Sequence, residues 1–384
     1  MRRRDILIAL AGSAAATLLS GCAKRESGEV SGAAPASAPV AASGPVAPAG
    51  PMGVAFVYAG NADDNAWIGS HELGAKAVEH KFGDRIKVTR LANVPDGVAC
   101  EQAFRDLASQ GNRLIFGTSF GYMDAMLKVA AEFPHTIFEH ATGYKSAPNL
   151  GTYDVRAYQG ANLAGVIAAY VSKRNIVGYV ASMPIPAVIR NIDAFAIAAR
   201  AINPAIKVQV AWTNSWSDPD KERAAAEALI GQGADVLMQN VDSASVMQVA
   251  QAHKIHAFGW DTDMSKYGPQ AHLGSIVIDW SQYYIKTVQQ VMEGQWTNQP
   301  VWNGIRHNAI DLVSINARVV PEVAQKAEAA RYDAFRDGTY DPFSGPLKDQ
   351  AGTLRVPAGK TLDDAEKHAI NWFVEGVEGA LPTD

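Results

Sequence analysis

The chain has 384 residues, of which 48% are hydrophobic and 19% are charged, and its net charge is −5. This length and apolar content are enough for two domains, each with a hydrophobic core of its own. A mildly acidic chain without a basic stripe is not expected to bind nucleic acid.

The first 22 residues, MRRRDILIALAGSAAATLLSGC, differ in character from the rest of the chain. Three arginines precede a short apolar run that ends in small residues at Cys22. This pattern is typical of an export signal, and the run is too short for a membrane-spanning helix. The ending LSGC resembles the lipobox of bacterial lipoproteins, which implies cleavage before Cys22 and a lipid on its sulfur. The alternative is a buried cysteine within an ordinary signal peptide.

Residues 23–52 are rich in Ala, Pro, Ser and Gly. Such a composition buries little apolar surface and favours an extended or disordered segment. We expect it to tether the folded part of the chain to a membrane, in the periplasm or at the cell surface. With Cys22 lipidated, Cys100 has no partner for an intramolecular disulfide and is expected to be a buried core thiol.

Two stretches of the chain have nearly the same pattern, LASQGNRLIFGTSF at 107–120 and LIGQGADVLMQNVD at 229–242. Gly233 follows Gly111 by 122 positions. The same offset aligns three further pairs of apolar runs, which are 54–61 with 176–183, 86–94 with 208–216, and 136–141 with 258–263. Short apolar runs that end in small or polar residues are typical of strands in a parallel sheet covered on both faces.

Helical patterns separate these apolar runs. Segments 67–83 and 100–111 in the first half correspond to 188–204 and 222–233 in the second half. The 100–111 and 222–233 segments each end with a glycine, which is placed as a helix C-cap. Each half is therefore predicted to fold as β-α-β-α-β-α-β. Since crossover connections are right-handed, each half should form a Rossmann-like α/β lobe.

We expect two lobes with a cleft between them, because ligands of open parallel sheets bind beyond the carboxyl ends of the strands. Lobe 1 is predicted over 53–157 with a returning segment at about 276–300. Lobe 2 is predicted over 158–275 with a segment at about 301–320. Residues 321–384 are predicted to be a helical extension without chemistry of its own. We expect the protein to be a monomer.

Three motifs near the predicted strand ends carry a family resemblance. They are GNADDNAWIGSHELGAKA at 60–77, SWSDPDKE at 215–222 and FGWDTDMS at 258–265. Together they resemble the BMP (basic membrane protein) family of purine-nucleoside-receptor-like lipoproteins, which have the type I periplasmic-binding-protein fold. The resemblance covers about residues 53–315. It implies a substrate-binding protein that closes on a purine nucleoside or related heterocycle and delivers it to an ABC permease in the inner membrane, with no catalysis and no cofactor.

The loop after the first strand of lobe 1 carries Asn61, Asp64, Asn65 and Trp67. Trp67 matches the family's stacking aromatic, and stacking of a flat ring on an indole is worth about 1–3 kcal/mol by analogy with nucleic-acid bases. The alternative is a core tryptophan that anchors the first helix. Asp64 and Asn65 are candidates to hydrogen-bond ring nitrogens or an exocyclic amine, or to cap that helix.

Ser119 and Tyr122 follow the third strand of lobe 1 in the segment GTSFGY. Small polar residues and glycines in such a segment let the backbone approach a ligand. In lobe 2, Trp216 lies where the family has its second aromatic. Two aromatic rings from opposite lobes would hold a planar ligand between them and couple binding to closure of the cleft.

The third and fourth strands of lobe 2 end in polar side chains. Gln239 and Asn240 can present a donor and an acceptor to a base edge, as these residue types do to adenine, and Asp242 follows them. Asp261 ends the fourth strand and matches the family's ligand-binding carboxylate. Asp218, which precedes a proline, is instead predicted to be the N-cap of a helix.

The stretch LGSIVIDW at 273–280 departs from the family pattern. Nucleoside receptors of the family carry a lysine here that helps to hold the sugar, whereas this chain has Ile278 and Asp279. The departure predicts a purine nucleobase, adenine-like, as the ligand. A purine nucleoside receptor and a sugar receptor on the same fold are the alternatives within the receptor class.

An enzyme of the nucleoside hydrolase kind is the alternative from another class. Acidic stretches at 63–64 and 261–263 could in principle hold a metal. The sequence contains no H-E-x-x-H, C-x-x-C or G-x-x-x-x-G-K motif, which favours a receptor. A receptor that signals through a membrane sensor kinase would share the same cleft.

Overall fold

The computed structural model describes residues 50–63 and 66–382. The predicted signal segment with Cys22, the tether up to residue 49, and the candidate residues Asp64 and Asn65 lie outside the described residues. Residues 50–384 form one structural unit. Within the described ranges, no helix combines the length and the hydropathy that a membrane span requires.

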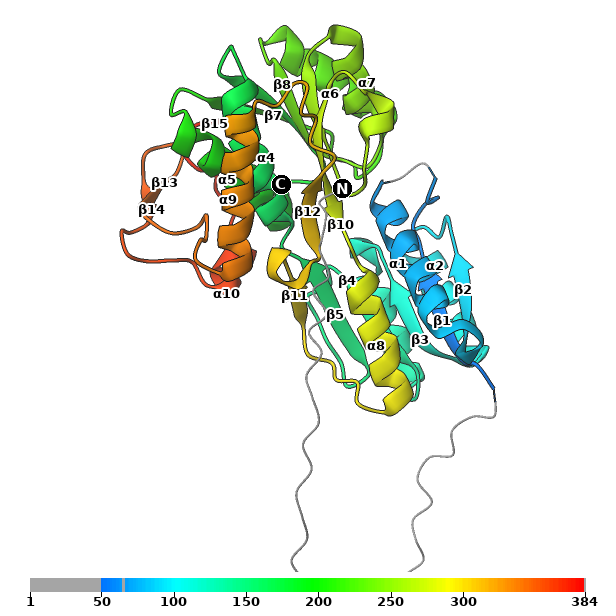
Figure 1. The fold of residues 1–384 in the computed structure, drawn as a ribbon. Helices are drawn as coiled ribbons and strands as arrows, with labels where there is room; N and C mark the ends of the chain where they lie inside the picture. Colours follow the sequence, from blue (N-terminus) through cyan, green and yellow to red (C-terminus); the bar gives the residue numbers. More distant parts are fainter. Residues whose placement is uncertain (1–49, 64–65, 383–384) are drawn as a thin grey trace, which may run out of the picture. The chain divides into compact units, whose positions relative to one another are not determined.

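The first sheet has six strands in the order β11-β5-β4-β3-β1-β2, and all its pairings are parallel (Figure 1). Its strands are β1 (Met52–Val57), β2 (Ile86–Leu91), β3 (Asn112–Gly117), β4 (Ile137–Ala141), β5 (Leu150–Val155) and β11 (Val301–Asn303). The helices of this lobe are α1 (Ala66–Phe82), η1 (Gly83–Arg85), α2 (Val98–Ser109), η2 (Phe120–Tyr122), α3 (Met123–Glu132) and α8 (Ser281–Glu293). Helices cover the sheet, so its central strands are buried, as their unbroken apolar runs predict.

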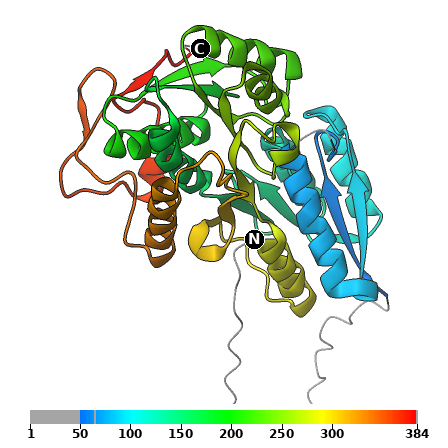
Figure 2. The same cartoon turned by 45° about the horizontal axis from the view of Figure 1, so that its top comes forward.

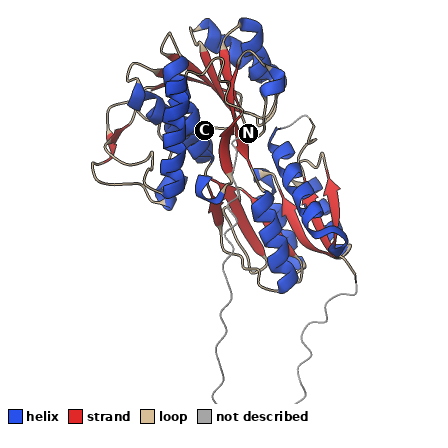
Figure 3. Cartoon of the chain, in the orientation of Figure 1, coloured by secondary structure: helices blue, strands red, loops and turns tan. Residues whose placement is uncertain are grey.

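The second sheet has seven strands in the order β12-β10-β9-β8-β6-β7-β15. Its strands are β6 (Ile176–Ala181), β7 (Lys207–Trp212), β8 (Val236–Asn240), β9 (His256–Gly259), β10 (His272–Ile278), β12 (Ile310–Val313) and β15 (Val377–Glu378). Its helices are α4 (Ala157–Val171), α5 (Pro186–Ile202), α6 (Pro219–Gly231), α7 (Ser245–His253), η3 (Ser265–Tyr267) and η4 (Ile305–His307). Only the edge strand β12 runs antiparallel, against β10. Figure 3 shows the same layering of helices around both sheets.

The two lobes have the same topology, as the repeat in the sequence predicts. The order β5-β4-β3-β1-β2 of the first sheet recurs as β10-β9-β8-β6-β7 in the second. The strand order reverses next to β1 and β6, and such switch points are where open α/β sheets bind ligands at the carboxyl ends of their strands. The fold therefore provides one such edge on each lobe.

The chain passes between the lobes three times, after β5, after β10 and after β11. We call these three crossings the hinge. Two predicted boundaries are wrong. Residues 276–278 belong to β10 in the second sheet, so the returning segment begins only with α8. Strand β11, which the prediction assigned to lobe 2 within 301–320, pairs with β5 in the first sheet, and its three residues are too few to show a sheet-specific pattern.

The prediction of a helical extension over 321–384 is correct only for its beginning. Helix α9 spans Glu322–Asp337, whereas α10 (Asp364–His368) has five residues. The rest consists of loops, the two-stranded β13 (Leu347–Lys348) and β14 (Leu354–Val356), and β15. We call residues 339–382 the C-terminal segment. It packs on lobe 2, because β15 extends the second sheet beside β7 (Figure 2).

Helix α8 returns to lobe 1 and is fixed there by buried polar contacts. The Tyr284 hydroxyl lies 2.8 Å from the Tyr153 hydroxyl on β5. Glu139 on β4 accepts hydrogen bonds from the Tyr283 hydroxyl at 2.7 Å and from Trp296 Nε1 at 2.6 Å. Burial raises the pKa of Glu139 to about 7, although these two hydrogen bonds act in the opposite direction.

The buried Glu139 makes the stability of lobe 1 depend on pH. Its folded-state pKa lies above its ordinary value of 4.5, so between these values the folded protein binds more protons than the unfolded chain. Its contribution to stability therefore falls as the pH rises from about 4.5 to about 7 and stays low above that. We expect Glu139→Gln to gain about 3 kcal/mol relative to the wild type between pH 5 and pH 8.

Urea unfolding of the wild type and of Glu139→Gln at several pH values measures this difference in the free energy of unfolding. Glu293→Gln, at the exposed last residue of α8, is the control. Equal pH slopes in Glu139→Gln and the wild type would contradict the prediction.

Candidate functional site

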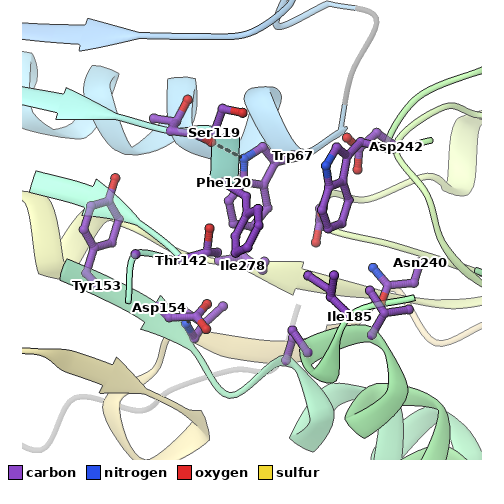
Figure 4. Close-up of a pocket in the computed structure, with 18 of the residues that line it drawn as sticks. Trp67, Ser119, Phe120, Thr142, Tyr153, Asp154, Ile185, Asn240, Asp242 and Ile278 are labelled. Atoms are coloured by element: carbon purple, nitrogen blue, oxygen red, sulfur yellow. Dashed lines mark hydrogen bonds between the residues drawn. The ribbon is translucent and has the colours of Figure 1, made fainter. Parts of the chain in front are cut away.

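A cavity of about 1230 Å³ lies between the carboxyl-end loops of the two lobes (Figure 4). Residues after β1, β3 and β4 line it from lobe 1, and residues after β7, β8 and β9 line it from lobe 2. Six predicted ligand-binding residues line this one cavity in addition to Trp67. They are Asn61, Ser119, Trp216, Asn240, Asp242 and Asp261.

Trp67 is both a structural anchor and a cavity residue, so the two interpretations of its sequence position are compatible. Its Nε1 donates a 2.7 Å hydrogen bond to the Thr118 carbonyl (Figure 4). The ring meets His71 and Trp280 edge-on, with centroid distances of 4.5 and 5.6 Å. These contacts hold the indole in one orientation while the side chain remains partly exposed in the cavity. A ring fixed in this way loses little further freedom when it stacks on a ligand.

Trp216 follows β7 on the opposite lobe and is 38% exposed. Its carbonyl accepts a hydrogen bond from the backbone nitrogen of Asp242 at 3.1 Å, which ties the Trp216 loop to the end of β8. The loop thus carries an exposed indole on a fixed backbone. An indole exposed at the edge of a cavity can contact a ligand with its apolar faces.

Asp261 is the most unusual polar group of the site. It is 1% exposed, and neither carboxylate oxygen has a hydrogen-bond partner among the described residues. Its φ of 61° lies in the left-handed region, where aspartate is tolerated better than most residues. Burial, and then the charge of Asp242, raise the pKa of Asp261 well above its usual range. The two carboxyl oxygens of Asp261 can accept hydrogen bonds from a ligand, and the protonated form can also donate one.

Asn240, at the end of β8, is a second polar residue that lines the cavity from lobe 2. Its Oδ1 accepts a 2.8 Å hydrogen bond from Asn191 Nδ2 on α5. Both asparagines line the cavity. The bond between them fixes their orientation and leaves the Asn240 amide nitrogen and the Asn191 amide oxygen available to a ligand.

Two predicted ligand contacts lie in the core instead. Tyr122 is fully buried, donates a 2.6 Å hydrogen bond to the Val94 carbonyl and packs edge-on against Phe104. Gln239 is also fully buried and donates to the Phe258 carbonyl at 2.9 Å. Neither lines the cavity. For Gln239 the reason is the pleat, since neighbouring strand residues point to opposite faces and Asn240 is the one that faces the ligand.

The remaining predictions concern single residues around the cavity. Ser119 lines it and donates a 3.0 Å hydrogen bond to Asp96 Oδ1. Asp218 caps α6 as predicted, accepting from the Lys221 backbone nitrogen at 3.1 Å. Ile278 lines the cavity, so an apolar side chain stands where the resemblance implies a lysine, whereas Asp279 does not line it.

Several cavity residues were not predicted from the sequence. They lie at the hinge end of the cavity and are Asp154, Arg156, Arg190, Trp302, Asp364 and His368. The one sequence signal for them was the position of Asp154 at the end of a buried strand. Asp364 and His368 belong to the C-terminal segment, and no pattern in the sequence indicates that this segment reaches the cavity.

Residues 117–121, GTSFG, match the G-x-S-x-G pattern that surrounds the nucleophilic serine of α/β-hydrolases. In a hydrolase the histidine would face the serine hydroxyl. Here His140 Nε2 contacts the Ser119 carbonyl oxygen at 2.7 Å, and the hydroxyl faces Asp96. Within the described residues, no group of three or more His, Cys, Asp or Glu is arranged to hold a metal ion.

Two α/β lobes of equal topology, joined by three crossings and enclosing a cavity at their strand ends, define a bilobal substrate-binding protein. A family model described as Bmp, ABC transporter substrate-binding protein PnrA-like, matches residues 52–335. The chain belongs to this family, as the sequence motifs predicted. It is therefore a substrate-binding protein and not an enzyme, binds a small molecule outside the cytoplasm and serves an ABC permease.

Relatives of the chain include proteins with named ligands. A purine-binding protein of Brucella abortus is 40% identical over 329 residues, covering 86% of this chain and 93% of the relative. A Haloferax volcanii protein named as an ABC transporter glucose-binding protein is 32% identical, covering 100% of this chain and 98% of the relative. The solved structure of a solute-binding protein from Conexibacter woesei has a TM-score of 0.63 at 22% identity. It covers 76% of this chain and 98% of its own, and it shows the same fold.

The unpartnered Asp261 predicts opposite effects on stability and on binding. We expect Asp261→Asn to raise the melting temperature of the ligand-free protein by a few degrees, since it removes a buried ionisable group and asparagine tolerates the same φ. We expect the same variant to weaken ligand binding by about tenfold or more, because an amide NH2 replaces a carboxyl oxygen that can accept a hydrogen bond from the ligand.

Scanning calorimetry of ligand-free protein and isothermal titration with purine measure the two effects. Asp263→Asn, on the neighbouring loop, is the matched control. A less stable Asp261→Asn protein that binds with wild-type affinity would show that the carboxyl is structural.

Proposed function

We propose that this protein is the receptor of an ABC importer for a purine nucleobase, which it holds between Trp67 and Trp216 with one edge of the base against Asp261. The observation that carries the proposal is Asp261, a buried carboxyl that has no hydrogen-bond partner within the described part of the chain and lines the same cavity as two tryptophans. The name of the Brucella relative supports a purine as the ligand.

The chemistry of the cavity suits a flat heterocycle. An indole face on each lobe matches the two faces of a planar ring, and closure of the lobes would bring both into contact with it. The edge of a purine alternates ring nitrogens with N–H or exocyclic groups. The Asp261 carboxyl and the Asn240 amide nitrogen can supply the acceptor and the donor that such an edge requires.

Ile278 supports a free base over a nucleoside as the preferred ligand. It is 5% exposed and presents a branched alkyl group where the resemblance implies a sugar-binding lysine. The sequence predicted a preference for adenine from Gln239 and Asn240. Because Gln239 lies in the core, only Asn240 can contact the base. We therefore assign a purine base without choosing among adenine and the oxopurines.

Removal of the Trp67 indole tests the stacking. We expect Trp67→Ala to weaken base binding by about 5- to 150-fold, the equivalent of about 1–3 kcal/mol. Trp67→Phe should retain most of the affinity, since it keeps an aromatic face but loses the hydrogen bond to Thr118. Isothermal titration with adenine, hypoxanthine, guanine, xanthine and their nucleosides measures both variants.

Wild-type affinity in Trp67→Ala would refute the stacking role. Adenosine or inosine binding more than about tenfold tighter than every free base would refute the preference for bases. The Haloferax relative makes D-glucose the informative additional ligand, and binding of glucose without binding of any purine would replace the proposal by a sugar receptor.

We further propose that the mature protein is anchored to a membrane by a lipid on Cys22, with residues 23–49 as the tether. Support comes from the lipobox resemblance and from the family, whose proteins work outside the cytoplasm. We expect Cys22→Ser to move the protein from the membrane fraction to the soluble extracytoplasmic fraction. Fractionation and mass spectrometry of the N-terminus measure this, and a membrane-bound Cys22→Ser protein would contradict the anchor.

A further inference from the structure

The wall that lobe 1 contributes to the cavity differs in chemistry from the opposite wall. In the loops after β1, β2, β3 and β4, every described residue that lines the cavity is uncharged. The charged residues that line it come from the end of β5 and the crossing after it, from lobe 2 and from the C-terminal segment. A ligand group that faces the described part of these lobe 1 loops therefore meets no formal charge.

Two exposed aromatic side chains stand on this wall. Phe120, at the start of η2, is 37% exposed, and Tyr144, in the loop after β4, is 64% exposed. Their ring centroids lie 5.8 Å apart at an interplanar angle of 33°. Both residues line the cavity, and we call them the aromatic pair. Two rings that contact each other and remain open to a cavity present an apolar surface that a ligand can cover.

The backbone that carries Phe120 is fixed next to the stacking tryptophan. The Thr118 carbonyl accepts the 2.7 Å hydrogen bond from Trp67 Nε1, and the Ser119 carbonyl oxygen lies 2.7 Å from His140 Nε2. Phe120 follows directly, and Figure 4 shows that the Phe120 and Trp67 side chains both project into the cavity. A ligand that stacks on Trp67 therefore has Phe120 as a close neighbour.

Tyr144 is carried by a tight turn after β4. The Thr142 backbone nitrogen donates a 2.7 Å hydrogen bond to the Tyr153 carbonyl, which ties the turn to β5. Lys145 Nζ lies 5.3 Å from the centroid of the Tyr144 ring and 2.8 Å from Asp124 Oδ1. The charge of Lys145 is thus partnered by a carboxylate, and the aromatic pair itself stays apolar.

The hydroxyl groups of this wall donate their hydrogens within the protein. Thr118 Oγ1 donates to the Val57 carbonyl at 2.9 Å, and Ser119 Oγ donates to Asp96 Oδ1 at 3.0 Å. Thr142 Oγ1 donates to the carbonyl of its preceding residue at 2.6 Å. A polar substituent of a ligand would lose its water here without gaining a donor from these three hydroxyls. The wall therefore favours an apolar substituent.

The cavity has room for such a substituent. Its volume of about 1230 Å³ exceeds the roughly 300–1,000 Å³ of pockets that bury drug-sized ligands, and a free base is smaller than those ligands. Asp261 and Asn240 bind one edge of the base from lobe 2 in the proposed function. The opposite edge of the ring then faces lobe 1, where the aromatic pair stands.

We propose that the aromatic pair receives an alkyl or aryl substituent on the base, so that the ligand of this receptor is a purine carrying an uncharged apolar group. This inference rests on the proposed function, since it requires the base to lie between Trp67 and Trp216. It concerns the edge of the base that lies away from Asp261, and it assigns that edge to lobe 1.

Isothermal titration with adenine, N6-benzyladenine and 9-benzyladenine tests the proposal, because the two benzyl compounds place the same aryl group at different edges of the ring. In the wild type we expect at least one of them to bind as tightly as adenine or more tightly. We expect Phe120→Ala and Tyr144→Ala each to weaken that compound about 5- to 30-fold and adenine by no more than about threefold.

Tyr170→Ala is the matched control. Tyr170 on α4 is exposed to the same extent as Phe120 but does not line the cavity, so this variant should leave every affinity unchanged. If Phe120→Ala does not fold, Phe120→Leu keeps an apolar side chain there and should give a smaller loss for the benzyl compound. Tyr144→Ala removes a largely exposed side chain and provides an independent test.

The possible outcomes separate the two proposals. A wild-type protein that binds adenine but neither benzyl compound within about tenfold of it overturns the apolar subsite and leaves the base receptor intact. Equal losses for adenine and for the benzyl compounds in both variants overturn it as well. Adenosine that loses as much affinity as the benzyl compound in both variants overturns the apolar character of the subsite. A wild-type protein that binds none of these compounds overturns the purine receptor itself.

Discussion

The structure depends on one constraint of parallel sheets, which is that crossover helices must cover both faces. Nearly every side chain of the central strands is therefore buried, and polar groups that serve a ligand have room only where the strands end. The chain meets this constraint twice with the same strand order. Because the two carboxyl edges contribute to one cavity, residues as distant in sequence as Ser119 and Asp261 line the same space.

The same constraint explains how much of the molecule could be predicted. The repeated apolar runs gave both lobes, because a buried parallel strand needs an unbroken apolar segment and little else. Trp67 and Trp216 could be placed in the cleft because each lies in the segment after such a run and matches an aromatic residue of the family, and Asp261 because it ends such a run and matches the family's carboxylate. Gln239 and Tyr122 could not be excluded, since the strand pleat and the turn of η2 decide which way a side chain points, and sequence spacing alone does not resolve this near a strand end.

The hinge end of the cavity was beyond prediction for a different reason. Strand β11 has three residues and owes its place to pairing with β5, and α10 owes its place to the contacts of Asp364 and Lys367 with arginines about 200 residues earlier. Local pattern carries no information about such contacts. They depend on the whole of lobe 2 being folded, including the addition of β15 to its sheet.

The polar groups that face the cavity reduce the stability of the ligand-free protein. Asp261 and Arg190 are each at least nine-tenths buried, with hydrogen-bonding atoms that lack partners among the described residues. Each costs folding free energy that a ligand can recover, and this recovery contributes to the affinity through which binding stabilises the folded state. The two residues lie on lobe 2, whereas Trp67, Asp154 and the crossing at Arg156 belong to lobe 1 or the hinge. A ligand that satisfies both sets must contact both lobes at once, so its binding would favour an arrangement in which the two lobes lie close together.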